Sequence, residues 1–358
     1  KYASISQEIL RAIEKGNEYL KSKQNPEGYW AQPSYPALTA LAVTAYMRDP
    51  ANQGKPLPEY IRKGYDFILK SQKEDGSIFN RGMSSYNTAV CMMALLAANK
   101  EEYAPAILKG RAYLIKQQNH FAPDNPYNGG IGYGDKQAPP IADLSNTSLA
   151  LEAIYYSQKL AKDGKYGEQP DLDWNAATEF INRCQQNPAV NKEPWVSNDK
   201  SQLGGFVYRP GVSSARDKKA AAFDKAEPPK AYGSMTYAGM QSLIYANVDK
   251  NDPRVKLALK WLENSYSLDE NPGMGVQGLY YYYQAMSKAL SAMGIDTLTL
   301  ENGRKVDWRD ELANKLISIQ KSDGSWVNTN NRWWEADPVL VTSYCVLALE
   351  QLYHSIPR

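Results

Sequence analysis

Two kinds of helical segment alternate along the chain, and the first kind carries a single apolar stripe. In the first example the stripe occupies positions that are three and four residues apart, namely Ile9, Ile13, Gly16 and Leu20. Charged residues such as Glu8 fall between these positions and point elsewhere. A helix of this kind covers a core with one face and meets water with the other.

The second kind of segment is apolar on nearly every side, so we expect it to be buried on more than one face. Six segments rich in Ala, Thr, Ser and Leu fit this description, at 36–47, 86–98, 145–157, 233–246, 274–290 and 338–352. Six half-exposed helices that alternate with six buried ones would leave apolar surface uncovered in an open stack. Closing them into a double ring, with the buried helices inside, removes that problem.

A repeated motif connects the two kinds of helix. In the two full copies Lys-Gly precedes an aromatic–aliphatic pair, a Gln follows, and a Gly-x-Trp or Gly-x-Ile turn begins four residues after the Gln. Full copies occupy 15–30 and 63–78, partial copies occupy 109–133, 180–206 and 320–326, and a degenerate copy surrounds Trp261 and Leu262. In the third copy we assign the turn to Gly130-Ile131-Gly132-Tyr133. The pattern predicts one all-α (α/α)6 toroid over residues 1–358, with repeats beginning near 6, 57, 104, 173, 252 and 308.

This motif resembles the QW motif of squalene and oxidosqualene cyclases, and the ring of hairpins is similar to the β subunit of protein prenyltransferases. The resemblance implies an aromatic-lined central cavity that acts on or binds an isoprenoid or other apolar small molecule. Two alternatives remain open: a non-catalytic toroid that serves as a scaffold or binding protein, and a carbohydrate-active enzyme of (α/α)6 form.

Cyclases of this family protonate a polyene with an Asp-x-Asp-Asp-Thr motif, and the matching stretch here departs from it. Residues 143–147 read Asp-Leu-Ser-Asn-Thr, so Ser145 stands at the proton donor's position and Asn146 replaces the last Asp. A serine hydroxyl cannot protonate an alkene. Asp143 remains a candidate acid and Asn146 a candidate ligand contact, while the same stretch also reads as a helix N-cap.

A metal site is not predicted. Protein prenyltransferases hold zinc with an Asp-x-Cys pair and a distant His, and no Asp-x-Cys occurs here. The histidines, His120 and His354, lie in a predicted loop and near the C-terminus. The three cysteines, Cys91, Cys184 and Cys345, are far apart, which is typical of buried free thiols. We therefore expect no metal and no cofactor.

Two further carboxylates precede the sixth buried helix. Glu335 and Asp337 follow Trp333 and Trp334, and they could form an acid/base pair. If all buried helices point the same way, these carboxylates and Asp143 share one mouth of the cavity, where crowding would raise a pKa. The alternative is that they are acids placed at helix starts by the helix dipole.

Aromatic residues with a polar edge are unusually frequent, with 26 Tyr and 8 Trp against 6 Phe. Four consecutive tyrosines, 280–283, cover every direction of the fifth buried helix, so at least one should face the cavity. In cyclases such rings stabilise carbocations, whereas in carbohydrate enzymes they stack on sugars. The candidate ligand-contacting aromatic residues are Tyr35, Tyr86, Tyr281, Tyr282, Trp333 and Trp334.

The remaining features restrict the partners. The net charge is +2 and the charges are interspersed, so no nucleic-acid partner is expected. No apolar run reaches the roughly 20 residues of a membrane span, and a closed ring needs no second copy, so we expect a monomer. The chain starts at Lys1 rather than at Met, which leaves open an export signal removed before this point. The segment 211–232 reads as a loop insertion, either a lid over the cavity or a surface loop.

Overall fold

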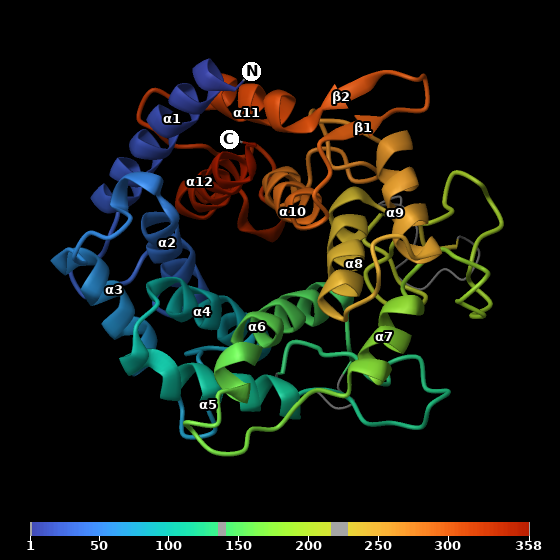
Figure 1. Cartoon of the computed structure of the whole chain (residues 1–358), viewed down its shortest axis with the longest axis horizontal. Coiled ribbons are helices and arrows are strands. Elements are labelled where there is room, and N and C mark those ends of the chain that lie inside the picture. Colours follow the sequence, from blue (N-terminus) through green and yellow to red (C-terminus); the bar gives the residue numbers. More distant parts are fainter. Residues whose placement is uncertain (1, 135–140, 216–227, 358) are drawn as a thin grey trace.

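Two concentric rings of helices make up this computed structural model, which describes residues 2–134, 141–215 and 228–357 (Figure 1). The inner ring consists of α2 (Pro36–Arg48), α4 (Ser84–Ala98), α6 (Leu144–Lys162), α8 (Gly233–Tyr245), α10 (Leu279–Ala292) and α12 (Pro338–Ser355). The outer ring consists of α1 (Ala3–Ser22), α3 (Glu59–Lys70), α5 (Ala104–Lys116), α7 (Trp174–Asn182), α9 (Pro253–Asn264) and α11 (Trp308–Ile319). The expected all-α (α/α)6 toroid is confirmed.

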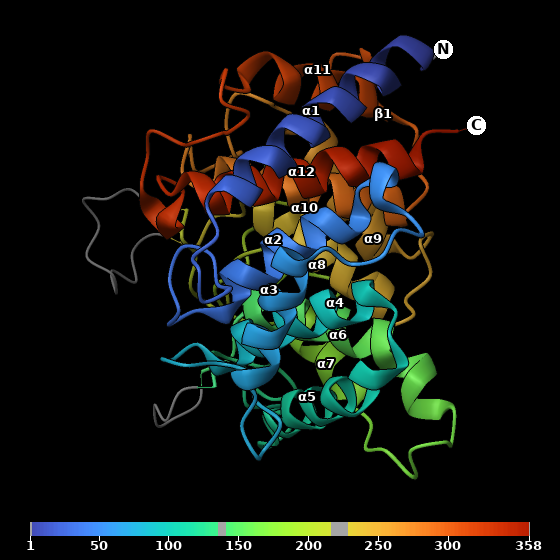
Figure 2. The same ribbon diagram turned by 90° about the vertical axis from the view of Figure 1, so that its left-hand side faces the viewer.

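The inner ring closes on itself. Each inner helix packs against the next in chain order, and α12 packs against α2, so no inner helix has an open edge. All six helices run in the same direction through the ring. Figure 2 views the ring from its side, with α12 running toward the C-terminus at the right.

The inner helices are buried almost all round, as their composition predicts. In α12, thirteen residues from Val339 to Leu352 are buried, and in α8 nearly every residue is buried. The fifth inner helix begins at Leu279, five residues later than the pattern predicted. Gly273, Gly275 and Gly278 all have positive φ, so residues 274–278 form a glycine-rich turn in place of the first helical turn.

The Gln of the repeat ties neighbouring hairpins together. In the first copy the Gln24 side-chain amide donates to the carbonyl of Gly28 in its own turn, at 3.0 Å, and to the carbonyl of Tyr60 in the next outer helix, at 2.6 Å. Gln72, Gln118 and Gln185 make the same pair of contacts. Gln320 donates to Ala12 of α1 at 3.0 Å, which joins the last repeat to the first.

The glycine turn packs so closely that only Gly fits. A Cβ on Gly76, which has φ +91°, would lie 2.1 Å from the Lys109 carbonyl oxygen of the next outer helix. The residue at the aromatic position of the turn donates its backbone N–H to a threonine side chain of the following inner helix. The acceptors are Thr39, Thr88, Thr147, Thr236 and Thr342. In the third copy the positive-φ glycine is Gly129, one residue before the position we assigned from the sequence.

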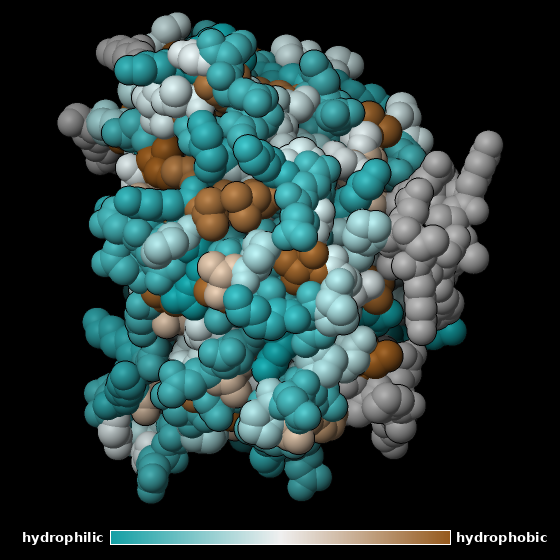
Figure 3. All heavy atoms as spheres, turned by 90° about the vertical axis from the view of Figure 1, so that its right-hand side faces the viewer, coloured by the Kyte–Doolittle hydropathy of each residue, from teal (hydrophilic) through white to brown (hydrophobic). Residues whose placement is uncertain are grey.

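The outer surface of the ring is polar. On the face shown in Figure 3 hydrophilic residues predominate and hydrophobic ones are scattered. A short antiparallel hairpin, β1 (Thr297–Thr299) with β2 (Lys305–Asp307), joins α10 to α11. In the described part of the chain, no helix combines the length and the apolar character that crossing a bilayer requires.

Candidate functional site

A cavity of about 340 Å³ opens among the N-terminal ends of the inner helices. We call it the first cavity. Every inner helix or the residue just before it contributes to the wall, for example Tyr35 before α2, Ser145 in α6 and Leu340 in α12. Because the six helices are parallel, their first turns converge on this one mouth. The expectation that the helix starts share a mouth is confirmed.

Tyrosine hydroxyls form pairs on the floor of the first cavity. Tyr86 hydrogen-bonds Tyr344, and burial raises the pKa of Tyr86 to about 12 against the lowering effect of that bond. The Tyr281 hydroxyl bonds Ser145, and burial raises the pKa of Tyr281 as well. The rings of Tyr281 and Tyr344 lie 5.9 Å apart. These hydroxyls are hydrogen-bonded to neighbouring side chains, so the floor presents mainly ring surface to a ligand.

Two exposed tryptophans stand at the mouth. Trp333 and Trp334 are 43% and 42% exposed and belong to a 3-10 turn, Arg332–Trp334. Both have positive φ, 54° and 63°, a conformation that costs a bulky residue about 1–3 kcal/mol. The Arg332 guanidinium stacks on Trp333 at 4.4 Å, and the Trp334 ring lies 4.9 Å from that of Tyr35. Strained, solvent-facing aromatic rings beside a cavity are typical of a binding site.

Asp143 is buried directly behind the cavity wall. It is the N-cap of α6, and its two oxygens accept from the Asn146 backbone N–H at 2.7 Å and from the Asn146 side-chain amide at 2.8 Å. Burial raises the pKa of Asp143 to about 6, while hydrogen bonds from Asn146 and Tyr208 and the charge of Arg209 act in the opposite direction. Asn146 itself lines the cavity. Asp143 therefore holds Asn146 in place.

Glu335 lines the first cavity but is engaged by the backbone of α10. Its carboxylate oxygens each accept from an N–H in the first turn of α10, those of Tyr280 and Tyr281, both at 3.0 Å. Asn328 donates to it at 3.1 Å. Burial raises the pKa of Glu335, and these three hydrogen bonds lower it. Glu335 thus caps α10 from another element, which the sequence did not indicate.

Two candidate residues lie away from the cavity. Asp337 caps its own helix α12, accepting from the Val339 N–H at 2.9 Å, and it does not belong to the cavity wall. Tyr282 is buried on the outward side of α10, where its hydroxyl donates to the Ser267 carbonyl at 2.9 Å. Of the four consecutive tyrosines, Tyr281 lines the first cavity. The rise in the Asp143 and Glu335 pKa values comes from burial rather than from crowding among carboxylates.

Several cavity residues had not been identified from the sequence, among them Met83, Tyr133, Tyr208, Tyr232 and Met235. Tyr232 stands directly before α8, as Tyr35 stands directly before α2, and this shared position is the signal that would have identified it. Tyr133 and Tyr208 come from the loops before α6 and α8, whose lengths vary between repeats. Both stand two residues after the aromatic-position residue of their copy, Ile131 or Phe206, and this shared position is the signal that would have identified them.

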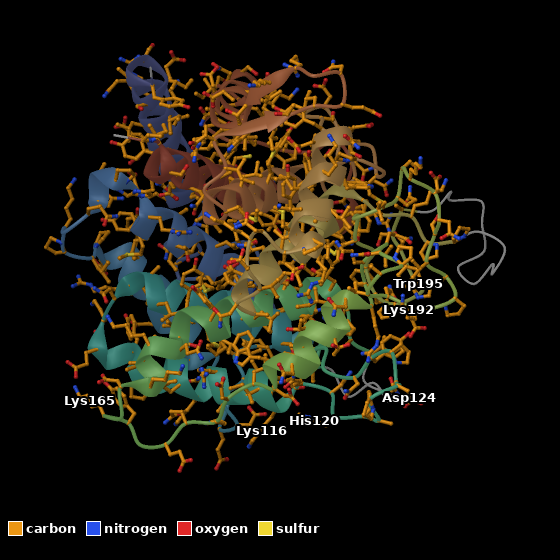
Figure 4. All side chains as sticks on the ribbon, turned by 45° about the vertical axis from the view of Figure 1, so that its right-hand side comes forward. Lys116, His120, Asp124, Lys165, Lys192 and Trp195 are labelled. Carbon is orange, nitrogen blue, oxygen red and sulfur yellow. The ribbon has the colours of Figure 1, made fainter. Side chains whose placement is uncertain are left out.

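The insertion at 211–232 touches the cavity through Tyr232, and its described ends pair with each other. Ala215 and Lys230 form an antiparallel bridge, and the Ser213 hydroxyl donates to the Lys230 carbonyl. Residues 216–227 of this insertion, on which the alternatives of a lid and a surface loop depend, fall outside the described residues. His120 lies in a peripheral loop beyond α5, near Asp124 (Figure 4). Among the residues described, no group of three or more His, Cys, Asp or Glu could hold a metal ion.

No protein-family model matches the chain. A type II terpene cyclase, MstE from Scytonema, solved with geranylgeranyl dihydroxybenzoate as substrate, matches with a TM-score of 0.59 at 10% identity, over 99% of this chain and 100% of that one. Candida albicans protein geranylgeranyltransferase-I complexed with GGPP matches with a TM-score of 0.58 at 14% identity, over 96% and 91%. An inactive α-1,6-mannanase variant from Salegentibacter in complex with α-1,6-mannotriose matches with a TM-score of 0.59 at 11% identity, over 97% and 100%. The chain thus has the toroid fold of terpene cyclases and prenyltransferases.

Proposed function

We propose that this protein binds a short apolar chain of isoprenoid type in the first cavity. The observation that carries the proposal is the wall itself, in which tyrosine and tryptophan rings alternate with Leu38, Leu149 and Leu340 around about 340 Å³. That volume lies at the low end of ligand pockets, roughly 300–1,000 Å³. Terpene cyclases and prenyltransferases of the same fold are solved with geranylgeranyl compounds.

The arrangement of the carboxylates favours binding over protonation of a polyene. Asp143 accepts from Asn146 through both oxygens and also from Tyr208, and it lies behind the wall. Glu335 directs both oxygens at the backbone of α10. Ser145, at the position of the proton donor in the cyclase motif, shares a hydrogen bond with Tyr281. In this proposal Asp143 positions Asn146 and Glu335 positions Tyr281. Neither carboxyl is assigned to transfer a proton to the ligand.

The test is calorimetric titration of the purified protein with farnesol, comparing wild type with Trp334→Ala. The ring of Trp334 forms the mouth with Tyr35, so its loss should weaken binding about two- to tenfold, as loss of an aromatic contact does. The matched control is Trp195→Ala, because Trp195 lies in a peripheral loop away from the ring centre (Figure 4). Absence of farnesol binding, or equal weakening in both variants, would contradict the proposal.

A carbohydrate is the second candidate ligand for the same cavity. The exposed Trp333 and Trp334 favour it, since tryptophan faces at an open mouth stack on sugar rings, and an α-1,6-mannanase shares the fold. The same titration with α-1,6-mannotriose separates the two candidates. Binding of mannotriose that is lost in Trp334→Ala, without farnesol binding, would replace the first candidate by the second.

A further inference from the structure

A second cavity lies at the opposite end of the ring interior. It has a volume of about 370 Å³ and is lined by the C-terminal halves of the inner helices. Four side chains line both cavities, namely Tyr86, Leu149, Tyr281 and Tyr344. These four form a layer across the middle of the ring. The second cavity therefore lies on the other side of this layer from the first.

The wall of the second cavity is largely apolar and carries a polar network. Glu152 of α6 and Lys288 of α10 form an ion pair at 2.5 Å, with side chains that are 11% and 20% exposed. The Tyr245 hydroxyl donates to Glu152 Oε2 at 3.3 Å, and the Gln241 amide donates to that hydroxyl at 2.5 Å. The chain thus places a connected polar network, contributed by three inner helices, inside an otherwise hydrophobic ring.

This network leaves hydrogen-bonding positions unused. Glu152 and Gln284 both line the cavity, so a ligand there can reach the Glu152 carboxylate and the Gln284 side-chain amide. The hydroxyl of Ser291, on the same wall, is buried and has no partner in the described part of the chain. Polar groups in such surroundings are normally paired. The unpaired Ser291 hydroxyl and the accessible Glu152 and Gln284 side chains therefore suit a ligand that brings both donors and acceptors.

An aromatic platform stands at the rim of the second cavity. Tyr156 is 51% exposed and lines the cavity, and its ring lies 5.2 Å from Tyr155 and 5.9 Å from Tyr245. A large exposed ring next to a hydrogen-bonding network suits a ligand with an apolar face and polar edges. A pyranose or a cyclic polyol has this form, because its C–H groups make a face and its hydroxyls lie around the edge.

We propose that the second cavity is a binding site for a neutral polyhydroxylated ring, a monosaccharide or a cyclic polyol, independent of the ligand of the first cavity. Glu152 and Lys288 neutralise each other, so a neutral ligand can join the network without breaking the ion pair. Its hydroxyls donate to Glu152 Oε1 and hydrogen-bond with Gln284, while its C–H face packs on Tyr156. Arg48 stands at the same wall and bonds Gln351 at 3.5 Å.

The experiment is saturation-transfer NMR and titration of the full chain with glucose, mannose, galactose and myo-inositol. We expect at least one of them to bind, and Gln284→Leu and Tyr156→Ala each to weaken that binding roughly two- to tenfold, the equivalent of one hydrogen bond or contact. Tyr156 is exposed, so its variant should fold even if Gln284→Leu does not. Tyr35→Ala alters the other mouth and should leave this affinity unchanged.

Three results would overturn the proposal. The first is that none of the four compounds binds to folded wild-type protein. The second is that binding is lost in Tyr35→Ala and retained in Tyr156→Ala, which would place the sugar in the first cavity. The third is that glucose 6-phosphate binds while the neutral compounds do not, since this would make the site an anion site around Lys288 and Arg48. Failure of farnesol to bind the first cavity leaves all three tests unaffected.

Discussion

The glycine at the repeat turn offers the sharpest test of the packing that closes each hairpin onto the next. In Gly76→Ala the new Cβ would meet the Lys109 carbonyl oxygen at 2.1 Å, and φ at this position is +91°. The matched control is Gly54→Ala, where φ is +72° and nothing lies within 4 Å of the Cβ. Both variants carry the left-handed strain of about 1–2 kcal/mol, partly offset by the smaller entropy of the unfolded chain. The clash belongs to Gly76 alone.

Gly76→Ala is destabilised further because the backbone at Lys109 must move away from the new Cβ. Pushing Lys109 away is an overpacking change that costs roughly 1–3 kcal/mol. The Gln72 amide bridges the same turn to the carbonyl of Ala106, and losing such hydrogen bonds adds about 0.5–1.5 kcal/mol each. We expect Gly76→Ala to be less stable than Gly54→Ala by about 2–5 kcal/mol in unfolding free energy.

Differential scanning calorimetry measures this difference. With an unfolding entropy of about 2.1 cal/mol/K per residue, the two variants should differ in Tm by about 3–7 °C in a chain of 358 residues. Gly324→Ala should resemble Gly76→Ala, because its Cβ would lie 2.3 Å from the Lys15 carbonyl oxygen at the closure of the ring. Tm values for Gly76→Ala and Gly54→Ala that agree within about 1 °C would refute the close packing of turn on helix.

Three further substitutions test the buried carboxyl groups. Because the folded pKa of Asp143 is raised to about 6 from 3.8, the folded state binds the extra proton, and wild-type unfolding free energy should fall by about 2.4 kcal/mol as pH rises from 4 to 7. Asp143→Asn should lack this decline in urea unfolding at several pH values, and an unchanged pH profile would contradict the burial argument. Glu335→Gln places an amide N–H₂ against backbone N–H groups of α10 and should cost about 1–3 kcal/mol at pH 7. Asp337→Asn, which changes the half-buried N-cap of α12, serves as its control and should cost about 0.5 kcal/mol or less. Equal losses of unfolding free energy in the two variants would exclude the capping role of Glu335. Glu350 is fully buried with both oxygens unpaired among the described residues, and burial raises its pKa well above the ordinary value. Glu350→Met should therefore stabilise the protein more at pH 8 than at pH 5, and equal gains in chemical denaturation at both pH values would show that Glu350 is ionised when folded.

The ring architecture could be predicted because each repeat carries the same local pattern of apolar and polar residues. A stripe such as Ile9, Ile13 and Leu20 encodes an outer helix, and a segment without a polar face, such as 338–352, encodes an inner one. Where the repeat pattern is incomplete, the predicted positions of helix starts and turns were wrong by a few residues. The start of α10 was placed five residues early because residues 274–278 are compatible with a helix apart from their glycines, and the third turn was assigned one residue late at Gly130.

The candidate site was predictable only in part, since a position on a helix does not give the neighbours of a side chain. Tyr281 and Tyr282 are adjacent and chemically identical, yet Tyr281 faces the first cavity while Tyr282 bonds Ser267 on the outside of α10. Which of the two faces inward depends on the rotation of α10 against α8 and α12. Tyr133 and Tyr208 reach the cavity from loops, whose paths are set by the packing of the whole ring.

The sequence by itself determined the number and order of the hairpins, because each repeat carries its own stripe, Gln and glycine turn, and these act over a few residues. It also determined that the proton donor's position of the cyclase motif is Ser145. The tertiary structure decided what the polar groups do. Glu335 became the cap of α10, where Tyr280 lies 55 residues away in the chain, and Glu152 met Lys288, more than one hundred residues away, in a second cavity, because the packing of the ring joins segments that are distant in the sequence. Interactions of that range depend on how all six hairpins pack, and a local pattern does not record them.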